Sequence, residues 1–414
     1  MEPEKKTAER SVKDLHARYQ KDWRVLYAIA HSFILRRFNM TFEELRTDGP
    51  VLMVPNHVTS WDPLLVGMSL KHKQMYYVGS EHIFRQGLAS WFLKRFLGPI
   101  ARPKGGSGLE TVRLCLEHLK AGHSVCLFAE GEASWDGQNI PIFPATGKLV
   151  KMSGASLVTY RLEGAFLSLP RWAKKIRRGK VYGHPVRIYS PEELAKMSAR
   201  EINAAIEADT FEDAFKRQKE QPVAYRGKNV AEGLERALYL CPQCGRIGTL
   251  RTKKDRLSCS CGLDTRYTEY GFFDPAVPVK AGSAGTLDAP ASFESFAGWY
   301  AWQKEELKRL YEEAPADAPD TARPDAPLFS DGGLRLTHVG SGHEETVLGQ
   351  GTLTQYRDRL TWEDRVFPLD SIDMMAMVKA NRLLFSLKTD YYEIVAKNDE
   401  NLKKYLDLYN IAKH

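Results

Sequence analysis

The first 230 residues alternate between short apolar runs and longer segments of mixed polarity. Residues 51–54 and 125–128 are short and almost wholly apolar, which predicts buried strands rather than helices. Polar side chains follow each of these runs at once. Because α/β folds expose reactive groups directly after buried strands, the pattern predicts an α/β domain with a site at the strand ends.

The pattern changes towards the C-terminus. The pattern predicts an aromatic-rich helix over residues 293–313, followed by a flexible spacer that runs to Pro327. Short strands are predicted at 334–336, 346–356, 359–362, 374–378, 383–387 and 391–395. A terminal helix over 400–411 would have one apolar face, formed by Leu402, Tyr405, Leu406 and Tyr409. This order of elements resembles a pleckstrin-homology or GRAM-like barrel, which could bind lipid or protein or serve stability alone.

The run Pro-Asn-His-Val-Thr-Ser-Trp-Asp-Pro at residues 55–63 follows the first predicted strand directly. Histidine is the side chain best suited to accept a proton near neutral pH, so His57 is a candidate general base. Asp62, across a turn, can hold the imidazole in one tautomer and stabilise its charged form. Such a pair suits a reaction in which the substrate's own hydroxyl is the nucleophile. The spacing alone also fits a loop histidine beside a helix-capping aspartate.

Three further segments follow in order: residues 90–102, residues 125–132 and residues 154–160. Together with His57 and Asp62, the series resembles the lysophosphatidic acid acyltransferase family, which transfers acyl groups to glycerolipids, over roughly residues 40–190. The resemblance implies a mixed-sheet α/β acyltransferase fold. It also implies transfer of a fatty acyl group from acyl-CoA or acyl carrier protein to the hydroxyl of a lysophospholipid resembling 1-acylglycerol-3-phosphate.

The resemblance also implies that Arg102, Glu130 and Gly131 hold the acceptor, and Asn56 and Lys104 are further candidates for substrate binding. The third segment departs from the family's Phe-Pro-Glu-Gly-Thr-Arg-Ser, because Ala133 stands where the arginine is expected. Either Lys104, Lys148 or Arg161 supplies that charge, or the acceptor is not a simple glycerol phosphate. A transferase with another lipid acceptor and a non-catalytic lipid-binding or scaffold protein therefore stay open as alternatives.

Four cysteines stand in two close pairs, Cys241/Cys244 and Cys259/Cys261, each followed by glycine. Two thiolate pairs joined by a predicted hairpin resemble a zinc ribbon, in which four sulfurs hold a structural zinc ion. Two disulfides are the alternative, and they fit a reducing cytosol poorly. Cys115 and Cys126 lie in apolar segments and are expected to be core residues. A catalytic block followed by Tyr-Arg-Gly-Lys at 225–228 and a zinc ribbon looks like a bacterial subgroup of these acyltransferases.

Charge and hydropathy bear on localisation. The chain carries a net charge of +7, with the excess in its first 230 residues and its densest basic run at 171–180. This charge favours binding to anionic lipid surfaces and phosphate-bearing substrates. Nucleic acid would also attract a basic run, but the sequence signatures of nucleic-acid binding are missing.

The hydropathy of the chain bears on membrane association. No run reaches the ~18 apolar residues of a spanning helix, and the charged start does not fit a signal peptide. Residues 25–35 fit either a helix in the membrane interface or one packed on the domain.

These patterns predict four parts: an acyltransferase domain with an N-terminal amphipathic helix at 1–230, a zinc ribbon at 231–275, an aromatic helix and linker at 276–328, and a β-rich domain with a C-terminal helix at 329–414. We expect a cytoplasmic enzyme that is peripheral on the inner face of the cell membrane.

Overall fold

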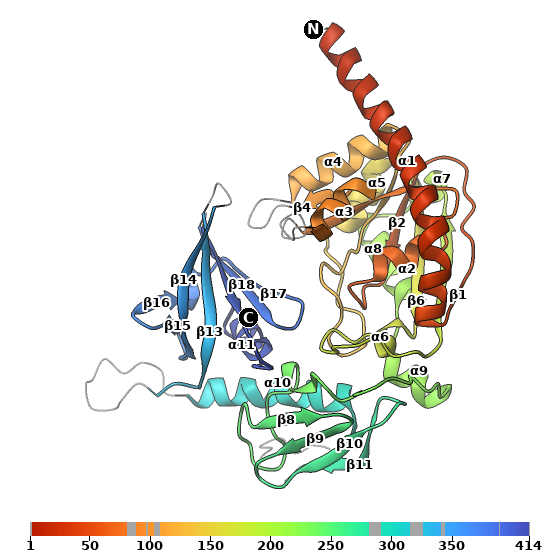
Figure 1. Ribbon diagram of the computed structural model, residues 1–414. Helices are drawn as coiled ribbons and strands as arrows, with labels where there is room; N and C mark the ends of the chain where they lie inside the picture. The colour runs from red at the N-terminus through yellow and green to blue at the C-terminus, as the bar shows by residue number, and fades with distance from the viewer. Residues whose placement is uncertain are drawn as a thin grey trace. The chain divides into compact units, whose positions relative to one another are not determined.

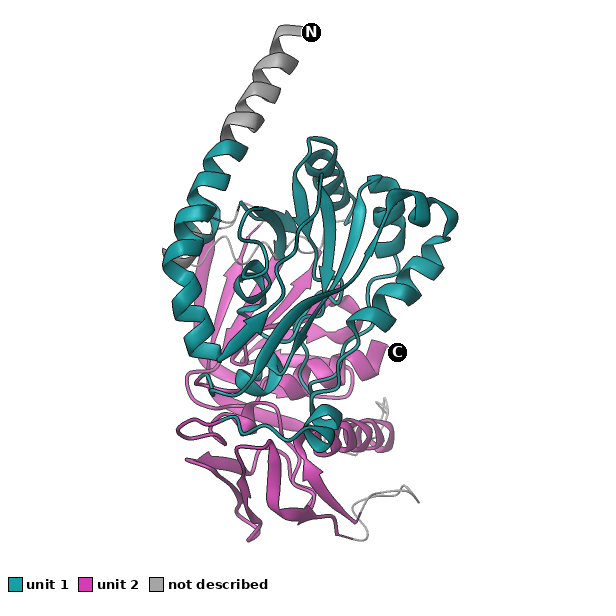
Figure 2. Cartoon of the chain, turned by 90° about the vertical axis from the view of Figure 1, so that its right-hand side faces the viewer, with its two compact units in different colours: residues 1–170, 176–225 teal, residues 171–175, 226–414 magenta. Residues whose placement is uncertain are grey.

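The computed structural model describes residues 2–80, 88–96, 98–102, 108–280, 291–314, 326–340, 344–388 and 390–413. The chain divides into two units, shown in teal and magenta in Figure 2. Unit 1 comprises residues 1–170 and 176–225, and unit 2 comprises residues 171–175 and 226–414. Among the described helices, none is long and apolar enough to cross a membrane.

Unit 1 is built on a seven-stranded sheet with the order β1-β7-β6-β2-β5-β3-β4 (Figure 1). The strands are β1 (Met40–Phe42), β2 (Val51–Pro55), β3 (Met75–Ser80), β4 (Ile100–Arg102), β5 (Ser124–Cys126), β6 (Ser156–Glu163) and β7 (Val181–Tyr189). Strands β6, β2, β5, β3 and β4 run parallel to one another, whereas β7 is antiparallel to β6. The prediction of a mixed-sheet α/β fold is therefore confirmed for this part.

Strand β2 is buried at every position, because both faces of the sheet around it are covered. On one face, Leu52 and Val54 share a core with helices α4 (Leu109–Lys120), α5 (Thr146–Ser153) and α8 (Ala199–Thr210). The other helices of unit 1 are α1 (Glu2–Phe38), α2 (Asp62–Gly67), α3 (Leu88–Phe96), α6 (Ala165–Ser168), α7 (Pro191–Lys196) and α9 (Ala214–Glu220). Helix α1 contacts the end of α2, where its Trp23 indole donates to the Leu70 carbonyl at 2.7 Å.

Unit 2 begins with a five-stranded antiparallel sheet ordered β12-β11-β10-β9-β8. Its strands are β8 (Leu250–Lys253), β9 (Arg256–Cys259), β10 (Asp264–Tyr267), β11 (Phe272–Pro278) and β12 (Ser292–Ser295). A short 3₁₀ helix, η2 (Leu234–Arg236), precedes it, and helix α10 (Phe296–Glu313) follows it. The hairpin expected between the cysteine pairs is formed by β8 and β9. Phe293 belongs to β12 rather than to the predicted helix, since the Ser295 hydroxyl accepts from Gly298 N and caps α10.

The C-terminal part of unit 2 is a seven-stranded antiparallel half-barrel ordered β16-β15-β14-β13-β19-β18-β17. Its strands are β13 (Phe329–Val339), β14 (Glu345–Gln355), β15 (Arg359–Trp362), β16 (Arg365–Pro368), β17 (Met374–Val378), β18 (Arg382–Leu387) and β19 (Asp390–Val395). A further 3₁₀ helix, η3 (Leu369–Ser371), links β16 to β17. Within the described residues the edge strands β16 and β17 do not pair, so the sheet stays open. The predicted β-rich domain is confirmed, and β16 is an additional strand.

The terminal helix α11 (Lys403–Lys413) differs from the prediction of a single apolar face. Its polar side is buried as well, because its charges are compensated inside unit 2. Lys404 Nζ lies 2.7 Å from Asp331 Oδ2, and the Tyr405 hydroxyl donates to the same oxygen at 2.7 Å. Lys403 pairs with Asp407 on the helix itself. A buried charge is costly unless it is paired, so these contacts allow a charged helix to lie in the interior.

Several side chains of the basic run at 171–180 form contacts within the protein. Arg171 donates to the Met377 carbonyl at 2.7 Å, and Lys174 forms an ion pair with Asp399 at 2.7 Å. Trp172 is fully buried in unit 2, where it contacts Tyr267. These residues are therefore less available to a membrane than the sequence pattern suggests.

Candidate active site

The parallel strands of unit 1 bring the sequence-predicted residues to one edge of the sheet. His57 follows β2, Glu130 follows β5, and Arg102 ends β4. These three strands run in the same direction, so their carboxyl ends lie at the same edge. Residues at this edge of an open α/β sheet are the usual place for a binding site.

His57 and Asp62 form a direct contact, as expected for a base and its partner. The Nδ1 atom of His57 lies 2.7 Å from Asp62 Oδ2, and the Asp62 side chain is completely buried. An ionised carboxylate can only accept, so Nδ1 carries the proton and donates to Asp62. The imidazole ring packs on Phe128 with 4.5 Å between ring centroids and keeps one fifth of its surface exposed. This arrangement leaves Nε2 as the ring nitrogen available to a substrate proton.

Asp62 owes its orientation to the loop that precedes it. Its Oδ2 atom accepts from the backbone N–H of Val58 at 2.6 Å and of Thr59 at 2.9 Å. Its Oδ1 atom accepts from the Thr59 hydroxyl at 2.9 Å. Helix α2 has Trp61 at its N-cap and no side-chain cap. Asp62 is therefore not the helix cap of the simpler interpretation; it folds the loop back so that His57 reaches the carboxylate.

Glu130 holds the backbone of the same loop. Its Oε1 atom accepts from His57 N and from Asn139 Nδ2, both at 2.9 Å, and its Oε2 atom accepts from Ile140 N at 2.8 Å. Burial raises the pKa of Glu130 to about 7 despite these donors. Both carboxylate oxygens accept hydrogen bonds from the protein, so Glu130 supports the loop that contains His57.

Asn56 also has a supporting position. Its side-chain amide donates to the Leu162 carbonyl at 3.0 Å, and its side-chain carbonyl accepts from Leu162 N at 2.7 Å. The residue is fully buried. These two hydrogen bonds join the end of β2 to β6. They use the side-chain amide that the sequence indicates as a candidate for substrate binding.

Arg102 remains a candidate for binding an anion. Its guanidinium carbon lies 4.4 Å from the centre of the Phe143 ring, and burial lowers its pKa. Within the described parts of the chain, Arg102 has no carboxylate partner. Gly131 is adjacent: a Cβ atom there would lie 3.3 Å from Arg102 Nη1. The positive φ of +79° at Gly131 lets the chain turn close to this cation.

The three cations considered as replacements for the missing arginine differ in their surroundings. Arg161 donates twice to the Asp209 carbonyl, at 3.0 and 2.5 Å, so its fork is already engaged. Lys148 is exposed on α5. Lys104 lies outside the described residues. The structure thus removes Arg161 from the candidates, because its donors bind the carbonyl of Asp209 in the last turn of α8.

The four cysteines of unit 2 form a compact cluster, with all four sulfurs within 4.8 Å of one another. Cys241 Sγ lies 3.7 Å from Cys261 Sγ, and Cys244 Sγ lies 3.9 Å from Cys259 Sγ. Disulfide sulfurs are ~2.05 Å apart, so these cysteines are not bonded to one another. A tetrahedral zinc ion with Zn–S bonds of ~2.3 Å separates its sulfurs by about 3.8 Å. The described cluster is compatible with a metal site of this geometry.

Sequence reasoning missed the residue that connects the site to the rest of unit 1. Asn139 donates to Glu130 and lies between Glu130 and the segment that follows α8. Nothing in its sequence neighbourhood, Gly137-Gln138-Asn139, distinguishes it from an ordinary turn.

Comparison with known proteins gives two results. Residues 37–163 match the family model described as Acyltransferase, and this range contains His57, Asp62, Arg102 and Glu130. The matched residues lie in unit 1. The chain is also similar to the crystal structure of the 1-acyl-sn-glycerophosphate (LPA) acyltransferase PlsC from Thermotoga maritima. The identity is 16% and the TM-score 0.36, over 48% of this chain and 93% of that chain.

The Gly131 turn provides a test of this site's packing. In Gly131→Ala the new Cβ would clash with the Phe143 ring, so Phe143 must move, and it would be tightly packed against Arg102 Nη1 at 3.3 Å. Gly122 is a matched control, since it also has a positive φ, +83°, but has nothing within 4 Å of its Cβ position. Chemical unfolding should show that Gly131→Ala costs about 1–3 kcal/mol more than Gly122→Ala. Equal losses would mean that backbone strain alone matters and that the close contact is absent.

Proposed function

We propose that this protein is an O-acyltransferase that moves a fatty acyl group from acyl-CoA or acyl carrier protein to the hydroxyl of a lysophospholipid, in phospholipid biosynthesis. The observation that carries the proposal is the buried Asp62 carboxylate 2.7 Å from His57 Nδ1. The acyltransferase match over residues 37–163 supports the reaction class.

In the proposed reaction, His57 Nε2 takes the proton of the acceptor hydroxyl as its oxygen attacks the thioester carbonyl. The new C–O bond forms first and the C–S bond then breaks. The imidazolium returns its proton to the departing thiolate, which leaves as the free thiol, so no proton is gained or lost overall. Asp62 offsets the positive charge that His57 carries between these two steps. Nδ1 stays bound to Asp62 throughout.

Arg102 is the proposed contact for the acceptor's phosphate, with Lys104 as a second cation. An arginine fork can engage two phosphate oxygens at once, and its stacking on Phe143 holds the plane of the fork in place. Glu130, Gly131 and Asn56 are proposed to shape this site: Glu130 and Asn56 hold the catalytic loop, and Gly131 makes room for Arg102.

Replacement of His57 tests the base. His57→Ala should lower kcat by two to four orders of magnitude, because the variant lacks the group that takes the proton in the proposed reaction. Asp62→Asn should also lower it strongly, since an amide does not stabilise the imidazolium. The assay uses purified protein, acyl-CoA and a panel of lysolipids, with thermal unfolding measured in parallel. His72→Ala is the matched control, because His72 is an exposed histidine of the same unit.

Each outcome has a distinct meaning. Full activity in His57→Ala would show that the base is misassigned. Wild-type protein that binds lysolipid without acyl transfer would instead support a non-catalytic lipid-binding protein. With an active enzyme, Arg102→Ala should raise KM for a phosphate-bearing acceptor far more than KM for the donor, and Arg102→Lys should recover part of the loss. Unchanged acceptor kinetics would point to an acceptor without a phosphate.

For unit 2 we propose a structural zinc ion held by Cys241, Cys244, Cys259 and Cys261, as in the zinc-ribbon subgroup that the sequence resembles. The sulfur separations of 3.7 and 3.9 Å match the edge of a zinc tetrahedron. Four thiolates leave no open coordination position, so the ion would stabilise the β8–β9 hairpin without taking part in acyl transfer.

Metal analysis should find one zinc per chain. Cys241→Ser should lose the metal and destabilise unit 2, whereas Cys115→Ala should keep it, because Cys115 is a buried cysteine of the unit 1 core. Inductively coupled plasma mass spectrometry and thermal unfolding before and after chelation provide the measurements. Stably folded, zinc-free wild-type protein would contradict the proposal.

We further propose that unit 1 binds the inner face of the cell membrane through one side of α1. Val25, Ile29 and Phe33 are 50, 73 and 57% exposed, and their spacing of four places them on one face of the helix. Trp23, Leu26 and Ile34 are buried, so the opposite side of the helix packs on unit 1. The helix would therefore pack on the domain with one side and lie in the membrane interface with the other. Exposed Lys21 and Arg36 extend the apolar face at its ends and favour anionic lipid.

Vesicle sedimentation tests this face. Replacing Val25, Ile29 and Phe33 together by serine should abolish most binding to vesicles that contain phosphatidylglycerol, because the inserted apolar area is lost. Val347→Ser is the control, since Val347 is equally exposed but lies on β14. Undiminished binding by the triple variant would assign the membrane contact to another surface.

A further inference from the structure

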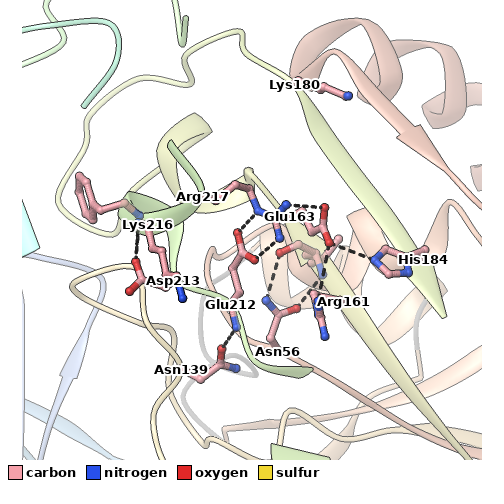
Figure 3. Close-up of polar contacts among 12 residues, drawn as sticks. Asn56, Asn139, Arg161, Glu163, Lys180, His184, Glu212, Asp213, Lys216 and Arg217 are labelled. Atoms are coloured by element: carbon pink, nitrogen blue, oxygen red, sulfur yellow. Dashed lines mark hydrogen bonds and ion pairs between the residues drawn. The ribbon is translucent and has the colours of Figure 1, made fainter. Parts of the chain in front are cut away.

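A continuous series of hydrogen bonds links the catalytic loop to a segment far along the chain. His57 N donates to Glu130 Oε1, and Asn139 Nδ2 donates to the same oxygen, each at 2.9 Å. On its other side, Asn139 Oδ1 accepts from Glu212 N at 2.6 Å, the contact drawn in Figure 3. One side chain thus joins the support of His57 to a residue that follows α8.

The segment around Glu212 is itself firmly held. Arg217 forms ion pairs with Glu212 at 2.7 Å and with Glu163, at the end of β6, at 3.1 Å (Figure 3). The backbone N–H of Ala214 donates to the Gly137 carbonyl at 3.0 Å. These contacts give Asn139 a fixed anchor, although residues 209–217 lie outside the range that matches the acyltransferase family.

Asn139 has a particular place among the donors to Glu130. Two of the three described donors are backbone N–H groups, of His57 and Ile140, and the third is the Asn139 amide. Each donor stabilises the ionised carboxylate, which is otherwise disfavoured by its burial. Among the described titratable groups, His57 is the one whose charge lowers the pKa of Glu130. A substitution at Asn139 can therefore remove one donor while leaving both backbone bonds.

We propose that Asn139 is a positioning residue for the acyl-transfer reaction: it holds the Glu130 carboxylate against the backbone of His57 and couples this support to residues 209–217. The proposal rests on the proposed function of His57. It predicts that the rate of acyl transfer depends on residues 209–217 as well as on the residues around His57 and Glu130.

Two readouts test the proposal. The Ile140 amide donates to Glu130 Oε2, so its ¹⁵N shift should titrate with Glu130, near pH 7 in the wild-type protein. In Asn139→Ala the midpoint should rise by about one pH unit, because a hydrogen bond to the charged form is lost. Asn139→Asp should raise it further, since a second carboxylate disfavours ionisation of the first. With ¹⁵N incorporated only at isoleucine, the signal is assigned by its disappearance in Ile140→Val.

The acid limb of the kcat profile should move in the same direction in both Asn139 variants, because protonated Glu130 holds the His57 backbone less firmly. We expect kcat at pH 7 to fall several-fold in Asn139→Ala, with KM for the acyl donor unchanged. Gln138→Ala is the matched control: Gln138 donates to Asp213 Oδ2 at 2.8 Å and so contacts the same segment, but not Glu130. It should change neither the amide midpoint nor the kcat profile.

The outcomes separate this inference from the function on which it rests. An Ile140 midpoint that does not move in Asn139→Ala overturns the contact with Glu130. A moved midpoint with an unchanged kcat profile leaves the acyltransferase standing but overturns the positioning role. If the wild-type protein transfers no acyl group to any acceptor, the proposed function fails and the positioning role fails with it, whatever the amide shows. Equal effects in Gln138→Ala would mean that general loosening of residues 209–217 explains the result.

Discussion

The burial of one ionised carboxylate, Asp62, governs the form of the proposed active site. A buried charge is tolerated only when hydrogen bonds and an opposite charge compensate it. Asp62 collects two backbone N–H groups, a hydroxyl and the His57 imidazole, all from the five residues before it. Satisfying this carboxylate requires the loop to fold back on itself. The same geometry that lowers the cost of burial orients the base.

A second carboxylate, Glu130, fastens this loop from the neighbouring strand. Because β2 and β5 are adjacent and parallel, the residues after them meet at one sheet edge. Glu130 then bonds to the backbone of His57, and Asn139 relays this support to Glu212. Both carboxylates near His57 contact it, and among the described residues Arg102 is the proposed contact for an anionic acceptor.

Unit 2 follows the same physical rule with different groups. Its interior contains the charged helix α11, whose Lys404 is compensated by Asp331. Its four clustered cysteines are only partly buried, since Cys261 is exposed. The sheet β8–β12 buries large apolar side chains such as Tyr267, Phe273 and Phe293, and the proposed metal ion would add stability at the β8–β9 hairpin. The half-barrel provides the rest of the hydrophobic core of unit 2, and α11 is buried next to it from Lys403 to Tyr409.

The sequence by itself determined the features that depend on neighbours along the chain. The apolar run at 51–54 identified β2, the spacing of His57 and Asp62 identified a contact within one loop, and the cysteine pairs identified their cluster. Only the tertiary structure decided the roles of Asn56, Arg161, Glu130 and Asn139. Each of these residues has a hydrogen-bond partner that lies 48 to 106 residues away along the chain. For Asn139 that partner is Glu212. Such pairs arise from strand order and helix packing, which spacing along the chain does not report. For the same reason the sequence predicted one apolar face for the terminal helix but not the burial of its polar side, since the acid that pairs with Lys404 comes from β13.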